Sequence, residues 1–324
     1  MRYKPLKTTA GLVTEFSQRI SQSIQKAVIG KPDVVQVAIA VLLAESHALL
    51  EDTPGVAKTV LVKALALSLG LEFRRIQCTP DLLPSDVTGS AIFNQKTSDF
   101  EFRPGPIFAN LLLVDELNRA TPRTQSALLE SMAERQVTSE GKARPLEPPF
   151  CVFATQNPFE YEGTFLLPEA QLDRFAVRLS IGYPSESTEL QLLELTRERH
   201  PLATITPVAQ LDELLSMQAA VRQIFVHEAV RRYIIQLVRS TRKHPDILIG
   251  ASPRAGMALF HLSQALSAVR GHEYVVPETA RYLAPFVLEH RLTLRPEARM
   301  RGRRAGHIVQ ELIERVPAPA PHKT

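Results

Sequence analysis

The sequence predicts an α/β fold in which a doubly wound, parallel five-stranded sheet is followed by an all-α domain. Five short apolar runs, separated by helical segments or loops, have the length and composition of buried parallel strands. They are Ala48–Glu51, Glu72–Gln77, Leu111–Val114, Pro149–Thr155 and Phe175–Ile181. From about Glu186 onward the pattern is helical throughout, with no strand signal. We therefore expect a sheet domain at 28–185 and a helical domain at 186–316, with a helix within 1–27 and a mobile proline-rich tail at 317–324.

Local signals place two helices directly after predicted strands. The segment Lys58–Leu69 is helical in pattern and ends at Gly70, a common residue at helix C-termini. Thr121 and Pro122 provide an N-cap and a proline at the first helical position of the other helix. Two hairpins interrupt the alternation of strands and helices: Ala91–Asn94 with Asp99–Arg103, and Gln136–Glu147.

Composition and charge exclude several classes of protein. The 324 residues are 44% hydrophobic and 22% charged with a net charge of +4, as in an ordinary soluble protein. The longest apolar stretch, Val37–Ala44, is far short of the ~20 residues that span a bilayer, and no apolar signal segment follows Met1. Cys78 and Cys151 are isolated, so neither a disulfide framework nor a zinc site is indicated. We expect a cytoplasmic protein without a membrane segment.

The loop between the first strand and the following helix has the pattern of a phosphate-binding loop. Backbone N–H groups in such a loop, and the N-terminus of the helix behind it, favour bound phosphate. Lys58 is placed to reach the β- and γ-phosphates, and the Thr59 hydroxyl to ligate Mg²⁺. Asp52 and Ala57 break the usual glycine pattern, Ala57 harmlessly if that position has helical dihedrals, and an ordinary surface lysine is the alternative. The expected nucleotide-binding residues of this loop are Thr53, Pro54, Gly55, Val56, Ala57, Lys58, Thr59 and Val60.

Two adjacent carboxylates, Asp115 and Glu116, follow the third apolar run. A buried strand has no packing reason to finish with two acids, so they indicate a catalytic pair. Asp115 is expected to hold Mg²⁺ through its hydration shell, and Glu116 to polarise the attacking water. Asn157 follows the fourth strand, where it either orients that water or forms a turn before proline. Together with the loop, these residues predict hydrolysis of ATP with Mg²⁺.

Three longer stretches carry a resemblance to a known family. The protein resembles the MoxR family of AAA+ ATPases in the runs LLLVDELNRATPRTQSALLESMAERQVT, VFATQNPFEYEGTFLLPEAQLDRF and ASPRAG. The resemblance extends over roughly Val28 to Gly306. It implies a P-loop AAA+ fold with a helical lid, a homo-oligomeric and commonly hexameric ring, and partners with von Willebrand A-type domains. The two hairpins resemble those of the helix-2-insert branch, which includes the magnesium-chelatase motor subunit.

The resemblance also implies roles for individual residues. Arg174 matches an arginine finger that enters a neighbouring subunit's site, although a surface ion pair with Asp173 or Glu169 is the alternative. Arg119 and Arg123 are rival candidates for that finger. Arg254 matches the lid arginine that touches the γ-phosphate within its own subunit. The segment Val28-Ile29-Gly30 resembles the one that lies against adenine, and Asn157 matches the family's polar sensor.

Six arginines crowd into fourteen positions near the C-terminus: Arg291, Arg295, Arg299, Arg301, Arg303 and Arg304. No aromatic residue is interleaved for base stacking, so a solvated helix face or a subunit contact is favoured over a nucleic-acid groove. We expect a ring-forming, Mg²⁺-dependent ATPase that remodels or matures partner proteins. A nucleic-acid motor related to clamp loaders is one alternative. A nucleotide-gated scaffold with little turnover is another, against which the intact Glu116 argues.

Overall fold

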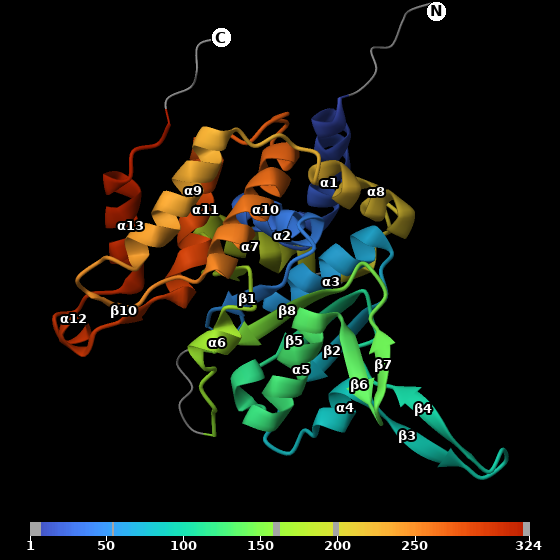
Figure 1. The fold of residues 1–324 in the computed structure, drawn as a ribbon. Coiled ribbons are helices and arrows are strands. Elements are labelled where there is room, and N and C mark those ends of the chain that lie inside the picture. The colour runs from blue at the N-terminus through green and yellow to red at the C-terminus, as the bar shows by residue number, and fades with distance from the viewer. Residues whose placement is uncertain (1–7, 54, 158–162, 197–200, 320–324) are drawn as a thin grey trace, which may run out of the picture.

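A parallel five-stranded sheet forms the centre of the N-terminal half (Figure 1). The computed structural model describes residues 8–53, 55–157, 163–196 and 201–319. The strands of this sheet are β1 (Ala48–Glu51), β2 (Phe73–Gln77), β5 (Leu111–Asp115), β8 (Cys151–Gln156) and β9 (Val177–Leu179). They lie in the order β2-β5-β8-β1-β9, and every neighbouring pair is parallel. The predicted fold class is confirmed, and the predicted strand boundaries agree with these to within two residues.

The two faces of the sheet are covered by different helices, because successive side chains of a strand point to opposite faces. In β1, Ala48 and Leu50 pack into one hydrophobic cluster and Leu49 packs into the other. The first cluster includes side chains of α1 (Thr9–Ile24), α2 (Pro32–Leu43) and α3 (Lys58–Leu69). The second includes side chains of α4 (Pro84–Thr88) and α5 (Pro122–Glu134). This doubly covered arrangement brings the loops after β1, β5 and β8 together at the carboxyl edge of the sheet.

Both predicted hairpins are present. Strands β3 (Gly89–Asn94) and β4 (Asp99–Pro104) pair antiparallel, and Figure 1 shows that they protrude from the sheet domain. Strands β6 (Gln136–Ser139) and β7 (Lys142–Pro145) pair in the same way and lead towards β8. Because both hairpins are insertions between strands of the central sheet, they leave its strand order unchanged.

The C-terminal half is helical, with one exception that the sequence did not predict. Strand β10 (Ile247–Ile249) pairs antiparallel with β11 (Thr293–Leu294), so the expectation of no strand after Glu186 is wrong. Strands of two or three residues are too short to show an alternating pattern, and their partners lie far apart in the sequence. The remaining elements are α6 (Glu169–Leu172), which precedes β9, then α7 (Glu186–Thr196), η2 (Pro201–Thr204), α8 (Leu211–Val221), α9 (Glu228–Thr241), α10 (Pro253–Val269), α11 (Pro277–Leu288), η3 (Glu289–Arg291), α12 (Pro296–Met300) and α13 (Ala305–Arg315).

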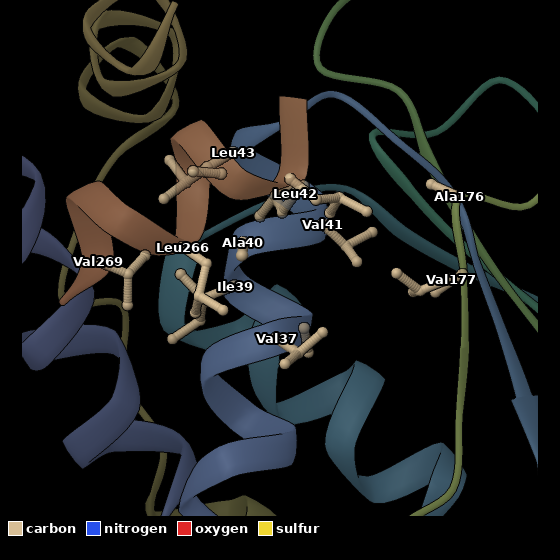
Figure 2. Packing of buried hydrophobic residues seen from close by; sticks show 14 of the residues in the cluster. Val37, Ile39, Ala40, Val41, Leu42, Leu43, Ala176, Val177, Leu266 and Val269 are labelled. Atoms are coloured by element: carbon tan, nitrogen blue, oxygen red, sulfur yellow. The ribbon is translucent and has the colours of Figure 1, made fainter. Parts of the chain in front are cut away.

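The helical half packs directly on the sheet domain. Figure 2 shows Leu266 and Val269 of α10 against the apolar side chains of α2, with Ala176 and Val177, at the start of β9, on the other side of α2. Leu43, at the end of α2, belongs to the same cluster and is almost completely buried. Burial of this kind contributes roughly 25 cal/mol per Å² of apolar surface. The position of the helical half is therefore fixed by a continuous hydrophobic core rather than by a flexible linker.

Residues 1–7, 54, 158–162 and 320–324 lie outside the described part of the chain, as does the segment 197–200. The expected N-terminal helix is present as α1. Most of the expected mobile tail at 317–324 falls in the last of the undescribed stretches. None of the described helices has the length and hydropathy of a membrane-spanning segment.

Candidate active site

The loop after β1 has the backbone geometry of a phosphate cradle. Gly55 has φ +85° with open space around it, and α3 begins at Lys58, directly behind the loop. The Thr53 hydroxyl is buried in the loop and has no hydrogen-bond partner among the described residues, as expected for a group that would meet a ligand. Pro54 lies outside the described residues.

Ala57 adopts a left-handed conformation, with φ +63° and ψ +22°, at the N-cap of α3. The position therefore does not have the right-handed helical dihedrals under which alanine would be harmless, and that expectation is wrong. A Cβ in the left-handed region costs about 1–2 kcal/mol. Such strain is common in functional loops, where the surrounding structure maintains it.

Asp52 has a structural role that accounts for a carboxylate at the entrance of the loop. Its Oδ2 accepts hydrogen bonds from the backbone N–H groups of Ile181 (2.6 Å) and Gly182 (2.8 Å), and from the Ser180 hydroxyl (3.0 Å). These donors belong to the segment that leaves β9 for the helical half. Asp52 therefore ties the phosphate loop to the connection between the two halves of the molecule.

The Lys58 side chain is held at the loop by a backbone carbonyl of the loop entrance. Its Nζ donates to the carbonyl oxygen of Asp52 at 2.6 Å. Desolvation lowers the pKa of Lys58 from its ordinary value, while four nearby carboxylates, those of Asp52, Asp115, Glu116 and Glu51, act in the opposite direction. The ammonium group is thus partly desolvated beside four acids, a setting in which a phosphate group would be a strong additional partner.

Asp115 lies at the tip of β5, opposite Thr59 at the start of α3. The Thr59 hydroxyl is 3.5 Å from Asp115 Oδ2, and the Thr155 hydroxyl donates to Asp115 Oδ1 at 3.2 Å. Hydroxyl and carboxylate oxygens are the hard ligands that Mg²⁺ prefers, and Mg²⁺ usually keeps several waters, so this pair fits the ion. Arg75 Nε also donates to Asp115 Oδ2 at 2.6 Å and would compete for the same oxygen. The sequence did not single out Arg75 or Thr155.

The Glu116 carboxylate is hydrogen-bonded to two neighbouring side chains. Gln77 Nε2 donates to Glu116 Oε2 at 2.8 Å, and Arg119 donates to the same oxygen at 3.0 Å. Glu116 itself has φ +55°, and its backbone N–H donates to the Thr155 hydroxyl at 2.9 Å. Gln77 was missed by sequence reasoning; its place at the end of β2, beside β5, is the signal that could have found it.

Asn157 follows the last residue of β8, between the tips of β5 and β1 in the strand order. Its backbone oxygen accepts from Asn118 Nδ2 at 3.4 Å. The structure therefore brings Lys58, Thr59, Asp115, Glu116 and Asn157 to one edge of the sheet, as expected for parallel strands.

The segment 28–30 lies beside the connection that follows β9. Gly30 has φ +73°, and a Cβ added there would lie 2.9 Å from the Thr188 hydroxyl. Val28 is buried, Ile29 is half-buried and Gly30 is exposed. A nucleotide in the loop would have this segment close by, since Asp52 is bonded to the same connection.

The comparisons with known proteins agree with this geometry. Residues 47–177 match the ATPase family associated with various cellular activities (AAA), and residues 239–312 match the AAA lid domain. The chain is 39% identical to Chaperone MoxR1 of Mycobacterium tuberculosis, covering 89% of this chain and 79% of that protein. The chain belongs to the MoxR family of AAA+ ATPases. Its enzyme class is accordingly ATP hydrolase.

Further relatives extend the MoxR-family match over nearly the whole chain. The uncharacterized protein YeaC of Bacillus subtilis is 49% identical over 92% of this chain and 93% of its own length. The crystal structure of a putative ATPase from Cytophaga hutchinsonii has 34% identity and a TM-score of 0.89, covering 96% of this chain and 97% of that chain. The helical half is thus the lid of a MoxR-type ATPase.

Two arginines that the MoxR resemblance implies to be catalytic lie together, far from the phosphate loop. Arg174 and Arg254 line one pocket of about 310 Å³ with Arg135, next to the residues that precede β1 and β9. We call this pocket the arginine edge. The phosphate loop follows the other end of β1, and the four residues of that strand alone span about 13 Å. In this structure Arg254 is therefore not next to the loop of its own subunit.

Arg174 does not form the surface ion pair with Asp173 that was the alternative to the finger role. The neighbouring Asp173 accepts from Arg291 Nε at 2.7 Å and from the Ser252 hydroxyl at 2.8 Å. Arg174 instead donates to the backbone oxygen of Leu129, at the end of the sheet opposite the phosphate loop. Of its rivals, Arg119 is bonded to Glu116, whereas Arg123 is exposed near the start of α5.

Three of the six arginines near the C-terminus of this MoxR-type lid form intramolecular ion pairs. Arg291 is buried and pairs with Asp173, which fastens the lid to the segment before β9. Arg301 and Arg303 both pair with Asp246 at 2.7 and 3.2 Å, across β10 and β11. Half of the cluster is thus occupied by intramolecular ion pairs, which favours the structural interpretation over a nucleic-acid groove.

Proposed function

We propose that this chain is a ring-forming, Mg²⁺-dependent ATPase that uses ATP hydrolysis to remodel or mature partner protein complexes. One observation carries the hydrolytic part of this proposal. Thr59 is hydrogen-bonded to Asp115 at the carboxyl edge of the sheet, and Lys58 lies close enough to Asp115 and Glu116 to interact with both carboxylates electrostatically.

Each residue has one step in this proposal. Lys58 leaves the carbonyl of Asp52 and neutralises phosphate charge. Glu116 leaves Gln77 and orients the attacking water, while Asn157 fixes the position of that water. Thr59 and Asp115 would hold Mg²⁺, which supplies charge neutralisation at the phosphates when it is bound. Arg75, which shares an oxygen of Asp115, has to move or share that oxygen when the ion binds.

We propose further that the active site is completed by a neighbouring copy. Arg174 and Arg254 lie at the arginine edge, opposite the phosphate loop, so neither completes the site of its own subunit in this conformation. A contact between one copy's arginine edge and the next copy's phosphate loop is head-to-tail, and such contacts form a ring when the rotation from copy to copy closes. A hexamer is the ring we propose. Arg254 would then act on the neighbour's γ-phosphate instead of its own.

The client protein is proposed from the family relationship alone. One relative is named Chaperone MoxR1, which agrees with a remodelling role. A protein with a von Willebrand A-type domain, and a cytoplasmic location, are what we propose for the client and the compartment. The nucleic-acid alternative has lost support, because Arg291, Arg301 and Arg303 are engaged in ion pairs.

The function is tested with two variants of the phosphate site. Glu116→Gln should bind ATP without turnover, because binding depends on Lys58 while the carboxylate acts on the water. Lys58→Ala should lose ATP binding, and removal of Mg²⁺ with a chelator should stop hydrolysis by the wild type. Client proteins should co-purify with ATP-loaded Glu116→Gln and not with Lys58→Ala. Hydrolysis by Glu116→Gln at a near wild-type rate would refute the assignment.

A further inference from the structure

Helix α7 presents an acidic and apolar face to solvent. At 100° per residue, Glu186, Glu189, Leu190, Leu193 and Glu194 fall within one arc of about 140°. Leu190 is 60% exposed and Leu193 is 70% exposed, although burial of a leucine is worth about 2 kcal/mol. The helix contains no lysine or arginine. An exposed face of this composition is typical of a helix that docks into a groove on another surface.

The position of α7 is tied to the phosphate loop. Thr188, on the opposite face of α7, is buried next to Gly30. The chain just before α7 is bonded to Asp52 through Ile181 and Gly182. We call the carboxyl edge of the sheet, with the phosphate loop, the nucleotide edge. A partner bound to the exposed face of α7 therefore lies beside the nucleotide edge.

A complementary groove runs between α9 and α10. It encloses about 550 Å³, and its floor is apolar, with exposed fractions of 51% for Ile235 and 55% for Met257. Three arginines, Arg231, Arg239 and Arg242, lie around this floor, and among the described residues no aspartate or glutamate lines the groove. The groove is therefore apolar and basic, whereas α7 is apolar and acidic.

The groove is continuous with the arginine edge. Met257 and His261 line both, and Pro253 of the groove is adjacent to Arg254. None of the described side chains of α7 lines the groove, and α7 lies behind α10 in the view of Figure 1, so the described part of α7 does not fill the groove of its own chain. The groove thus lies next to the arginine edge, whereas α7 lies next to the phosphate loop on a different side of the molecule.

We propose that α7 of one copy docks into the α9–α10 groove of the next copy, where Leu190 and Leu193 contact the apolar floor and the glutamates face the arginines. This inference rests on the proposed ring. It adds a contact between subunits that does not involve the nucleotide. Because the two surfaces carry opposite charge, they favour one orientation of the neighbouring copy. The same contact would bring the arginine edge of one copy to the phosphate loop of the other.

Disulfide trapping tests the contact directly. Leu193→Cys combined with Ile235→Cys should form a ladder of cross-linked species under mild oxidation, which appears with ATP and grows with protein concentration. The matched pair, Gln191→Cys with Gln236→Cys, is exposed on the same helices but outside the face and the groove, and should cross-link at least tenfold less. Equal cross-linking by both pairs, or a link within a single chain, would overturn the docking proposal.

The chain's own thiols do not interfere with this experiment. Cys78 and Cys151 are both buried. Desolvation raises the pKa of Cys78 to about 12 and raises that of Cys151 as well. Both therefore remain protonated and slow to react near neutral pH.

Charge substitution separates docking from the proposed function. Ile235→Glu places a carboxylate in the groove against the glutamates of α7, so the protein concentration for half-maximal assembly should rise about tenfold or more. Gln236→Glu, with the same charge one position along, should assemble as the wild type does. If Ile235→Glu assembles as Gln236→Glu does while both hydrolyse ATP in rings, only the docking proposal fails. If the wild type hydrolyses ATP without assembling, the proposed ring fails and docking fails with it.

Discussion

The nucleotide edge and the arginine edge differ in how their residues are brought together. At the nucleotide edge, Asp115 ends β5, Asn157 follows β8, and Lys58 begins the helix after the loop that follows β1, so chain order along one parallel sheet assembles them. At the arginine edge, Arg174 precedes β9 and Arg254 lies in the first turn of α10 in the lid. Their proximity depends on how the lid packs against the sheet, through contacts such as Ser252 with Asp173.

This difference teaches which kind of site can be seen in a sequence. Strand-tip residues are predictable because the carboxyl ends of parallel strands meet at one edge. Residues joined by domain packing are not, since many packings satisfy the same pattern. The two edges would also contribute differently to a contact between copies. The nucleotide edge contributes the phosphate loop, whereas the arginine edge contributes arginine side chains that lie far from the phosphate loop of their own chain.

The largest expected effect would come from removing Arg174. A finger arginine is worth about 10³–10⁵ in rate, or roughly 4–7 kcal/mol, which exceeds what an exposed ion pair provides. We expect Arg174→Ala to bind ATP but to be almost inactive. Mixing it with Lys58→Ala should restore some turnover, because Arg174 of one variant can complete the intact loop of the other.

Arg123→Ala is the matched control for this experiment, since Arg123 is an exposed arginine of the same domain. Turnover in the steady state should be measured over a range of protein concentrations, because rings have to assemble first. A mixture that stays inactive although mixed rings form would show that Arg174 does not act between subunits. Loss of activity in Arg123→Ala instead would move the finger to that residue.

The second effect concerns the stability of the arginine edge. His47 is buried there; its Nδ1 accepts from the Val152 N–H at 3.0 Å, and its Nε2 lies 3.3 Å from the Met132 oxygen. Burial lowers the pKa of His47 to about 4, from an ordinary value near 6.5. Below pH 6.5 the unfolded chain takes up a proton that the folded chain refuses, so stability is present above that pH and is lost down to about pH 4.

The loss amounts to about 3 kcal/mol for a shift of this size. His290, whose pKa burial also lowers, adds to it in the same direction. Denaturant unfolding between pH 7 and pH 4.5 should show the decline, and His47→Gln should have a smaller pH dependence because glutamine does not titrate. An identical pH dependence in both proteins would show that His47 is not buried as a neutral group.

Sequence reasoning reached most of the fold and the nucleotide edge for identifiable physical reasons. The helix from Lys58 to Leu69 and the N-cap at Thr121 were predicted because their signals are local. Gln77 and Arg75 were missed, since their importance comes from the pairing of β2 with β5. The pairing of β10 with β11 was missed because both strands are too short to carry a pattern.

The third prediction tests whether the hydrogen bond from Gln77 restrains the Glu116 carboxylate before ATP is hydrolysed. Gln77 holds the Glu116 carboxylate through a hydrogen bond of 2.8 Å, and Arg119 holds the same oxygen. A single bond to a half-exposed carboxylate is worth about 1 kcal/mol. We therefore expect Gln77→Ala to increase basal ATP turnover severalfold, while Glu116→Gln in the same background remains inactive. A decrease in turnover would mean that Gln77 positions Glu116 for catalysis instead of restraining it.

The smallest expected effect lies at Ala57. This residue has φ +63° at the start of α3, where a Cβ is disfavoured and glycine is not. Ala57→Gly also restores the glycine that phosphate loops usually carry. We expect a stabilisation of up to about 1 kcal/mol with ATP affinity preserved, because the greater freedom of glycine in the unfolded chain offsets part of the relieved strain. Ala133→Gly, in the right-handed last turn of α5 and exposed, should instead destabilise by up to about 1 kcal/mol. Opposite signs in denaturant unfolding would show that strain is specific to the phosphate loop; equal destabilisation of both variants would show that the loop tolerates alanine without strain.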